Sequence, residues 1–387
     1  MFAKMITRRR LLQYGAALPL SFRSWITQTP ERDLIAHLSE RIPNLIEQYR
    51  VPGLSVSIIR DAQILWSQGF GVKSVTTKEP VSIDTVFEAA SLSKPAFAYA
   101  VLRLFEKERY SLDAPLTEYV PQSFVKSFIR GEPRINLVTT RHVLSHTSGL
   151  PHGRELGSPI RLRFAPGSRF AYSATGMQYL QFVVEQLTKL SLRSMMRMAL
   201  LEPFGMTRSS FGWLDRFAAE AAVGHGRSGR PGLSGNGEYL QLPAAEKERL
   251  RKEFPDSSDE ASASAGLYTT APDYAKFMIE MMGPRRRSDY HLSDAMLAEM
   301  LKPQIAITPE ISWGLGWGVE RTGSGDAFWH WGDWGVFRNF AIGFQERKAG
   351  IVILTNSFNG PEVYRQIILD AIGGTHPAFA WVNSYRP

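Results

Sequence analysis

The hydrophobic pattern is most regular near the two ends of the chain. From residue 31 to 49, apolar residues recur at every third or fourth position, which is the spacing of an amphipathic helix. Two short runs rich in β-forming residues follow at 54–60 and 63–70, and only Asp61 and Ala62 separate them. This arrangement predicts a helix followed by a β-hairpin.

The last part of the chain repeats the β-type pattern. Four further runs occur at residues 317–320, 327–331, 337–344 and 350–355. Asn359, Gly360 and Pro361 then mark the start of a helix, which Gly373 ends. The strands at the two chain ends are therefore predicted to form one sheet with helices beside it.

The middle of the chain has a different character. From 116 to 264 the strand patterns fade and helical spacing takes over, so we expect a mainly helical insertion domain there. The two flanking parts, 29–115 and 265–387, would form the α/β domain. Residues 224–264 are too polar and too long for an ordinary connection. Their charged run EKERLRKE is interpreted as a solvated helix face, with a substrate lid as the alternative.

The composition is that of an ordinary globular protein. Of 387 residues, 44% are hydrophobic and 21% are charged, which excludes a disordered or collagen-like chain. There is no cysteine, so a disulfide scaffold is excluded as well. The length fits two or three structural units, or one large domain with an insertion.

The net charge of +8 belongs mainly to the N-terminus. Residues 1–28 contain five basic residues and no acidic ones, which leaves +3 for the rest of the chain. Such a small excess does not indicate a nucleic-acid partner.

This basic segment has the layout of an export signal. Arg8 and Arg9 precede an apolar stretch from 11 to 22, which resembles a twin-arginine leader. The stretch is shorter than the ~20 residues of a membrane-spanning helix, and no cysteine is present to carry a lipid. We therefore expect residues 1–28 to direct the protein to the periplasm or outside the cell, without a stable membrane anchor. A basic, disordered N-terminus is the alternative.

The first candidate for chemistry is a Ser-x-x-Lys element formed by Ser91 and Lys94. Pro95 places it at the start of a helix, because proline deeper inside would break the preceding turn. One turn apart, the two side chains share a face, so the amine can take the hydroxyl proton as Ser91 attacks a carbonyl. The alternative for Ser91 is a helix N-cap. Ser123 with Lys126 has the same spacing, but without a long apolar helix behind it we treat that match as coincidence.

Four longer strings extend this signal along the chain. FEAASLSKPAFAYAVLRL, LSHTSGLP, FAYSATGMQYL and FWHWGDWGVFRNF occur in the order found in the serine β-lactamase and penicillin-binding protein superfamily. The chain resembles the branch around class C β-lactamases, which includes esterases and D-aminopeptidase- or DD-carboxypeptidase-like enzymes. The resemblance covers nearly all of 31–373. It implies an α/β fold (α+β) with an antiparallel sheet built from both chain ends, flanked by helices, and an inserted helical domain.

The resemblance also implies roles for individual residues. Ser91 would be the acylated nucleophile, Lys94 its partner, and Tyr172 a second proton-transfer group. Tyrosine is a poor base near neutral pH unless a cation stabilises its phenolate, which we expect Lys94 to do. Taken alone, Tyr172 would instead be interpreted as a buried core aromatic.

The segment His330-Trp331-Gly332 resembles the Lys-Thr-Gly strand that lines one wall of such sites. Gly332 would let substrate lie close to the strand, and the backbone N–H of Asp333 would complete an oxyanion hole with that of Ser91. His330 is either a contact for substrate or a structural histidine.

Two departures weaken the resemblance to β-lactamases themselves. Two residues beyond Tyr172, Ala174 stands where those enzymes keep an asparagine that holds the acylamino group. His330 replaces the lysine that would bind a substrate carboxylate. Arg338 substitutes for that lysine if its strand folds back beside His330.

Tryptophan is concentrated near this segment. Five of the nine tryptophans lie within 22 positions, at 313, 317, 329, 331 and 334. We expect at least two of them in the core and the others around an apolar acyl or alcohol pocket.

A small histidine cluster, His142, His146 and His152, lacks the glutamate of a His-Glu-x-x-His metal site and runs into a Ser-Gly-Leu-Pro turn. A structural role is therefore predicted for it, and neither a metal nor a cofactor is expected.

These observations predict an exported serine hydrolase that acts through an acyl-enzyme. Its substrates would be small esters, or amides in D-amino-acid peptides and peptidoglycan fragments. A β-lactamase or DD-carboxypeptidase is the alternative within this class. An alternative from another class is a non-catalytic protein that binds or senses cell-wall fragments, which the missing asparagine at position 174 keeps open.

Overall fold

The computed structural model describes residues 31–129, 131–153, 160–234, 243, 261–283 and 289–385. The predicted leader at 1–28 lies outside these residues, as do most of the polar segment and the whole of its EKERLRKE run. The structure therefore does not test the predicted export signal or the interpretation of the EKERLRKE run.

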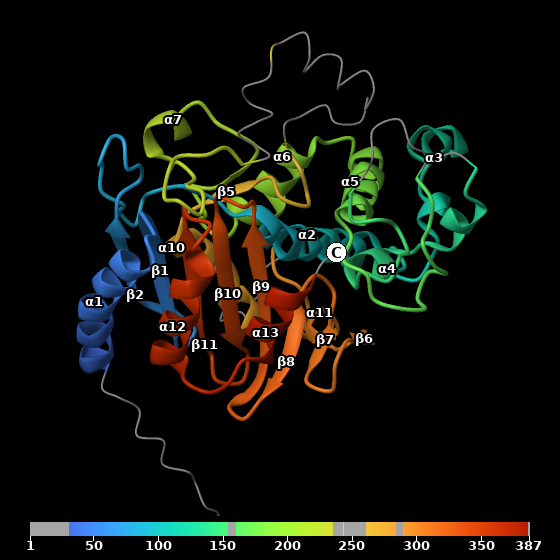
Figure 1. Ribbon diagram of the computed structural model, residues 1–387. Coiled ribbons are helices and arrows are strands. Elements are labelled where there is room, and N and C mark those ends of the chain that lie inside the picture. The colour runs from blue at the N-terminus through green and yellow to red at the C-terminus, as the bar shows by residue number, and fades with distance from the viewer. Residues whose placement is uncertain are drawn as a thin grey trace, which may run out of the picture.

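An eight-stranded antiparallel sheet dominates the described part of the chain (Figure 1). Its order is β2-β1-β11-β10-β9-β8-β7-β6, so the N-terminal hairpin lies directly beside the last strand. Leu54 is opposite Thr355 in that junction. The strands are β1 (Gly53–Arg60), β2 (Gln63–Gly71), β6 (Ile305–Ala306), β7 (Ile311–Trp313), β8 (Gly318–Thr322), β9 (Gly325–Asp333), β10 (Arg338–Phe344) and β11 (Ala349–Thr355). The prediction of one antiparallel sheet from both chain ends is confirmed.

The predicted hairpin ends within a residue of its expected bounds. Asp61 and Ala62, which separate β1 from β2, both have φ of 52°. Two successive residues with positive φ match the twist of a tight hairpin turn, which explains how two residues suffice here. The four C-terminal strands also lie where expected, whereas the short strands β6 and β7 had not been predicted.

Helices cover both faces of the sheet. Val352 and Leu354 of β11 face one hydrophobic cluster, while Ile351 and Ile353 face another. The second cluster is covered by α1 (Glu31–Gln48), α12 (Gly360–Ile372) and α13 (Pro377–Ser384), and the first by α2 (Ser93–Glu108) and α10 (Ala271–Met281) (Figure 1). Because both faces are buried, β11 shows a continuous apolar run rather than alternation.

Between residues 116 and 264 the described parts of the chain are largely helical. Their elements are α3 (Gln122–Phe128), α4 (Thr140–Leu144), α5 (Ala174–Thr188), α6 (Leu192–Met196), α7 (Phe217–Glu220) and the short helical turns η2 (Leu116–Glu118), η3 (Pro133–Leu137) and η4 (Arg197–Leu201). Helix α11 (Asp294–Leu301) precedes β6 in the C-terminal part.

A second, three-stranded sheet connects the helical part to the rest of the molecule. Its order is β3 (Phe87–Glu88), β5 (Leu267–Thr269) and β4 (Ser210–Phe211). One buried cluster also runs from α5 through α2 to the sheet face, so the helical part and the sheet share a continuous core. This small sheet had no sequence signal that we recognised, because each of its strands is only two or three residues long.

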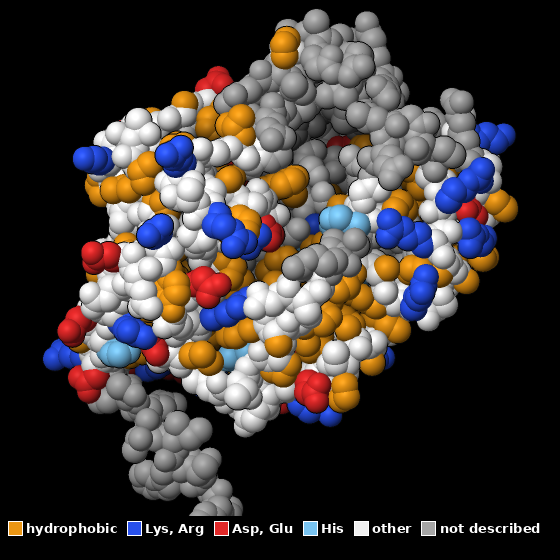
Figure 2. Space-filling view, in the orientation of Figure 1, with side chains coloured by type: hydrophobic (Ala, Val, Ile, Leu, Met, Phe, Trp, Pro, Cys, Tyr) orange, Lys and Arg blue, Asp and Glu red, His pale blue; other side chains and the backbone are white. Residues whose placement is uncertain are grey.

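The face of the molecule that carries α13 is rich in apolar side chains. Hydrophobic residues gather over α13 and the neighbouring strands β7 to β9 (Figure 2).

Within the described ranges, none of the helices combines the length and the apolar character needed to cross a membrane.

Candidate active site

Ser91 lies in the single helical turn η1 (Ala90–Leu92) that leads into α2. Lys94 follows in the first turn of α2, and its Nζ donates a hydrogen bond to Ser91 Oγ at 2.9 Å. The same Nζ donates to the carbonyl oxygen of Ser264 at 2.7 Å. The Ser-x-x-Lys spacing therefore brings the hydroxyl and the amine into direct contact.

Ser91 is not a helix cap. The N-cap of α2 is Leu92 and the N-cap of η1 is Ala89, and neither makes a side-chain capping bond. The hydroxyl that holds this turn is that of Ser93, which donates to Ala90 O at 2.6 Å and accepts from Leu267 N–H at 2.9 Å. The cap interpretation of Ser91 is therefore wrong, and its hydroxyl is directed to the amine of Lys94.

The amine of Lys94 is prepared to accept a proton. Its side chain is 1% exposed, and burial lowers the pKa of Lys94 from its usual value to about 7. A low-dielectric surrounding disfavours the ammonium form, so a large share of the amine is neutral at neutral pH. A neutral amine at hydrogen-bond distance from a hydroxyl is the arrangement required of a general base.

The ring of Tyr172 is the next group in contact with the amine of Lys94. The face of its ring lies 4.8 Å from Lys94 Nζ. Burial raises the pKa of Tyr172 well above its usual range, and the nearby Ser91 hydroxyl opposes that rise only in part. The expected phenolate, stabilised by Lys94, is therefore not favoured: the amine faces the ring rather than the hydroxyl, and Tyr172 is a neutral phenol that can donate a proton.

Two of the three clustered histidines surround Tyr172. The His146 ring lies 4.3 Å from that of Tyr172, and its Nδ1 accepts from Ser173 N–H at 3.1 Å. His152 lies 5.6 Å away and lines the same pocket as Ser91. Burial lowers the pKa of His152 to about 4 and that of His146 further below its usual range, so both rings are neutral near pH 7. The sequence predicted only a structural role, which fits His142, the partner of Thr139 in a capping box.

His330 lies behind the pocket wall rather than in it. Its side chain is fully buried, and Nδ1 lies 2.7 Å from the carbonyl oxygen of Trp331. Burial and the charge of Lys94 lower the pKa of His330 to about 3, so the ring is neutral. Of the two roles considered for His330, this placement favours the structural one.

Gly332 lines the cavity, and it is also required where β9 packs against the segment before Ser91. A Cβ at this position would lie 2.2 Å from the carbonyl oxygen of Ala89, next to the turn that carries Ser91. Strand β9 is thus in backbone contact with the segment just before Ser91. Asn339 strengthens this junction, since its amide donates to Glu88 O at 2.9 Å and accepts from Thr355 N–H at 2.9 Å.

Asp333 and Arg338 enter the pocket together from paired positions of β9 and β10. Arg338 Nε donates to Asp333 Oδ1 at 3.1 Å, and its guanidinium lies 3.8 Å from the Phe358 ring. Arg338 therefore lies beside Asp333. The residue of β10 opposite His330 is Ala341, so Arg338 is not the strand neighbour of His330. The guanidinium of Arg338 is thus a positive charge in the pocket, and the carboxylate of Asp333 beside it offsets part of that charge.

The resulting cavity measures about 470 Å³. Its lining residues come from both ends of the chain: Ser91, His152, Tyr172, Trp331, Gly332, Asp333, Arg338, Pro361, Tyr364, Val382, Asn383 and Tyr385. The last three belong to α13 and the residue after it, which sequence reasoning missed. Of the five tryptophans, 313, 317 and 329 are fully buried, which confirms the core interpretation for them, and Trp331 faces the cavity.

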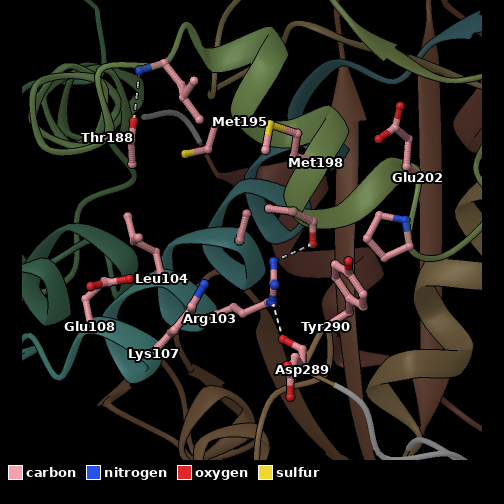
Figure 3. Close-up of a pocket in the computed structure, with 14 residues that line it drawn as sticks. Arg103, Leu104, Lys107, Glu108, Thr188, Met195, Met198, Glu202, Asp289 and Tyr290 are labelled. Carbon is pink, nitrogen blue, oxygen red and sulfur yellow. Dashed lines mark hydrogen bonds between the residues drawn. The ribbon is translucent and has the colours of Figure 1, made fainter.

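A second cavity, of about 680 Å³, lies at the C-terminal half of α2 (Figure 3). Arg103 crosses it and is hydrogen-bonded to Asp289 O and Ala199 O (Figure 3). The Thr188 hydroxyl in its wall donates to Val184 O. Arg103 and Thr188 are thus engaged in structural hydrogen bonds, and the cavity with the Ser91–Lys94 pair is the better candidate for catalysis.

A family model decides what kind of protein carries this site. The model described as Beta-lactamase matches residues 22–373. The chain belongs to the Beta-lactamase family. This family member is 27% identical over 320 residues to Esterase EstB of Burkholderia gladioli. The matched region covers 74% of this chain and 78% of the esterase. It is 22% identical to Unguisins hydrolase ungD of Aspergillus violaceofuscus, with 88% of this chain and 65% of that protein covered.

Solved structures share the fold of this Beta-lactamase family member. D-alanine carboxypeptidase AmpC from Burkholderia cenocepacia has a TM-score of 0.71 at 19% identity, covering 88% of this chain and 99% of that one. The octameric penicillin-binding protein homologue from Pyrococcus abyssi has a TM-score of 0.68 at 23% identity, covering 88% and 77%. The family and its hydrolase relatives identify the chain as a serine hydrolase and argue against a purely binding or sensing protein.

Proposed function

We propose that this protein hydrolyses small uncharged carboxylic esters through an acyl-enzyme on Ser91. The observation that carries the proposal is the 2.9 Å hydrogen bond between Lys94 Nζ and Ser91 Oγ at the base of a 470 Å³ cavity. A hydroxyl in contact with a partly neutral amine is an activated nucleophile.

In the first half of the reaction, Ser91 Oγ forms a bond to the carbonyl carbon and its proton passes to Lys94 Nζ. The carbonyl oxygen becomes negative, and the backbone N–H groups of Ser91 and Asp333 are the donors proposed for it. When the bond to the leaving oxygen breaks, that oxygen takes the proton held by Lys94, directly or through the Tyr172 hydroxyl, so Lys94 is neutral again. Water then attacks the acyl carbon and gives a proton to Lys94. The bond between that carbon and Ser91 Oγ breaks, Ser91 Oγ takes the proton back from Lys94, and the acid is released.

The pocket walls favour an ester over a β-lactam. Trp331, Tyr364 and Val382 offer apolar contact to a compact acyl or alcohol group. A β-lactam needs its carboxylate and acylamino group bound, whereas His330 is neutral and buried and Ala174 has no amide. A simple ester requires neither contact.

We therefore expect kcat/KM for p-nitrophenyl butyrate to exceed that for nitrocefin by about 30-fold or more. Loss of one polar or charged contact typically costs about 5- to 150-fold, and two such contacts are missing. Steady-state assays of both substrates with one enzyme preparation measure the ratio. A larger kcat/KM for nitrocefin would contradict the proposal.

A second candidate activity is the cleavage of peptides that end in a D-amino acid. Arg338 favours it, because a guanidinium in the pocket can bind a terminal carboxylate if it releases Asp333. Release of D-alanine from a D-Ala-D-Ala peptide, measured beside ester hydrolysis and compared between the wild type and Arg338→Gln, distinguishes the two activities. Loss of the peptide activity alone in the variant would assign that role to Arg338.

We also propose that the protein is exported by the twin-arginine route. The supporting observation is Arg8-Arg9 before a short apolar stretch. Changing both arginines to lysine should leave the protein in the cytoplasm, as measured by fractionation and blotting. An unchanged distribution between cytoplasm and periplasm would refute the leader.

A further inference from the structure

The active-site cavity has a wall that lies beyond the family match. The family model ends at residue 373, whereas Val382, Asn383 and Tyr385 line the cavity together with Ser91. These residues belong to α13 and the position after it. This part of the site is formed by residues 374–385, which lie outside the matched range and which we call the C-terminal wall.

The C-terminal wall holds the backbone of Tyr172 directly. The Tyr172 N–H donates to Tyr385 Oη at 2.9 Å. The amides on either side of it are bonded to His146: Ala171 N–H donates to the His146 carbonyl oxygen at 2.8 Å, and Ser173 N–H to Nδ1 at 3.1 Å. Three successive amides are thus fixed from two directions, and the middle one depends on the C-terminal wall.

The wall is built firmly into the molecule at its start. His376 Nδ1 lies 2.8 Å from Glu320 Oε1, and these two side chains are 1% and 0% exposed. Glu320 Oε2 also accepts the N–H of Ala378 at 2.8 Å, and His376 Nε2 lies 3.1 Å from Gly373 O. A buried carboxylate on β8 thereby anchors the first turn of α13 through two groups.

Aromatic stacking fixes the other end. Trp381 stacks on Tyr385 with ring centroids 4.5 Å apart and 20° between the planes. The Trp381 ring also contacts Trp331, which faces the cavity, at 5.7 Å. Asn383 accepts a hydrogen bond from Arg365 of α12. The C-terminal wall is thus held at both of its ends.

We propose that the C-terminal wall is the specificity element of this site: it positions Tyr172 through Tyr385 and limits the length of substrate that reaches Ser91. The proposal rests on the ester hydrolase function proposed above. Val382 is the apolar side chain of this wall that lies against the cavity, so shortening it lengthens the space available. Tyr385 is a positioning residue, since it acts on the backbone of Tyr172.

The length limit is tested with Val382→Ala. We expect the ratio of kcat/KM for long to short substrates to rise about tenfold in one of two series, p-nitrophenyl esters from butyrate to decanoate or butyrates of increasingly long alcohols. Leu369→Ala is the matched control, because Leu369 is a 41% exposed apolar residue of α12 outside the cavity. Ratios within twofold of the wild type in both series would show that Val382 does not limit the length of the substrate.

The positioning role is tested with Tyr385→Phe, which removes the hydroxyl acceptor and keeps the ring that stacks on Trp381. We expect kcat for a short ester to fall about tenfold per titrated active site, with KM within twofold of the wild type. Tyr110→Phe, which removes a hydroxyl far from the cavity lining, is the control. An unchanged kcat per fluorophosphonate-titrated site would overturn this role, even if thermal stability falls.

A wild-type protein that hydrolyses no ester and forms no fluorophosphonate adduct refutes the proposed function, and the specificity element with it. A wild-type protein that is active, with both variants behaving like their controls, refutes only the role of the C-terminal wall.

Discussion

Replacing Ser91 with alanine should lower kcat toward esters by about four to six orders of magnitude, the range seen when a nucleophile is removed. The fold should be unaffected, because the Ser91 hydroxyl caps no helix and its contact, Lys94 Nζ, keeps a second bond to Ser264 O. Intact-mass spectrometry after incubation with a fluorophosphonate should show one adduct on the wild type and none on the variant.

Ser123→Ala is the matched control for that experiment. Ser123 has the same spacing to Lys126, but it lies exposed on α3. Its loss should leave both the adduct and the rate unchanged. Acylation of the Ser91 variant at the wild-type level would show that another residue is the nucleophile.

The second large effect is expected at Lys94. If its neutral amine takes the proton from Ser91, kcat/KM should rise with pH through about 7 and then level off, because the pKa of Lys94 is lowered to about 7 and the protonated form is inactive. Below that pH the rate should fall about tenfold for each pH unit. Lys94→Met should reduce kcat by about 10³-fold, the typical contribution of a general base.

Lys94→Arg separates proton transfer from charge. Arginine keeps a positive charge at this position but does not release its proton in the accessible pH range. The variant should therefore be as inactive as Lys94→Met, and activity within tenfold of the wild type would contradict the base role. Since position 94 is buried, melting curves show whether each variant folds, and the pH profile of the wild type tests the same role without any substitution.

Local patterns in the sequence were sufficient for six of the eight strands of the main sheet and for the helices α1, α2 and α12. The period of apolar residues in α1 and the β-rich runs of β1, β2 and β8 to β11 reflect burial against neighbours that the whole fold supplies, so their positions could be predicted. The strands β3 and β4 could not be predicted, because a two-residue strand has no period. Helix α13 had no periodic run long enough to recognise, and its place is set by distant contacts such as the one between His376 and Glu320.

The site was predictable where function depends on adjacent residues and not where it depends on distant ones. Ser91 and Lys94 are one turn apart, so their contact follows from helical geometry. The positions of His152 and Tyr385 beside Tyr172 follow from tertiary packing, and no local pattern in the sequence indicates them. The electrostatic error at Tyr172 has the same origin, since the depth of burial that raises its pKa is a property of the folded chain.

The backbone contact between Gly332 and Ala89 also has a consequence for the order of folding. The turn that carries Ser91 is held by β9, by Asn339 of β10 and by Leu267 of the small sheet, which are far away in the sequence. Contacts of such high sequence separation form late, after a large loss of chain entropy. We therefore expect Ser91 to reach its place beside Lys94 only after β9 and β10 have packed against its turn. Recovery of ester hydrolysis during refolding should accordingly report the last step of folding rather than the first.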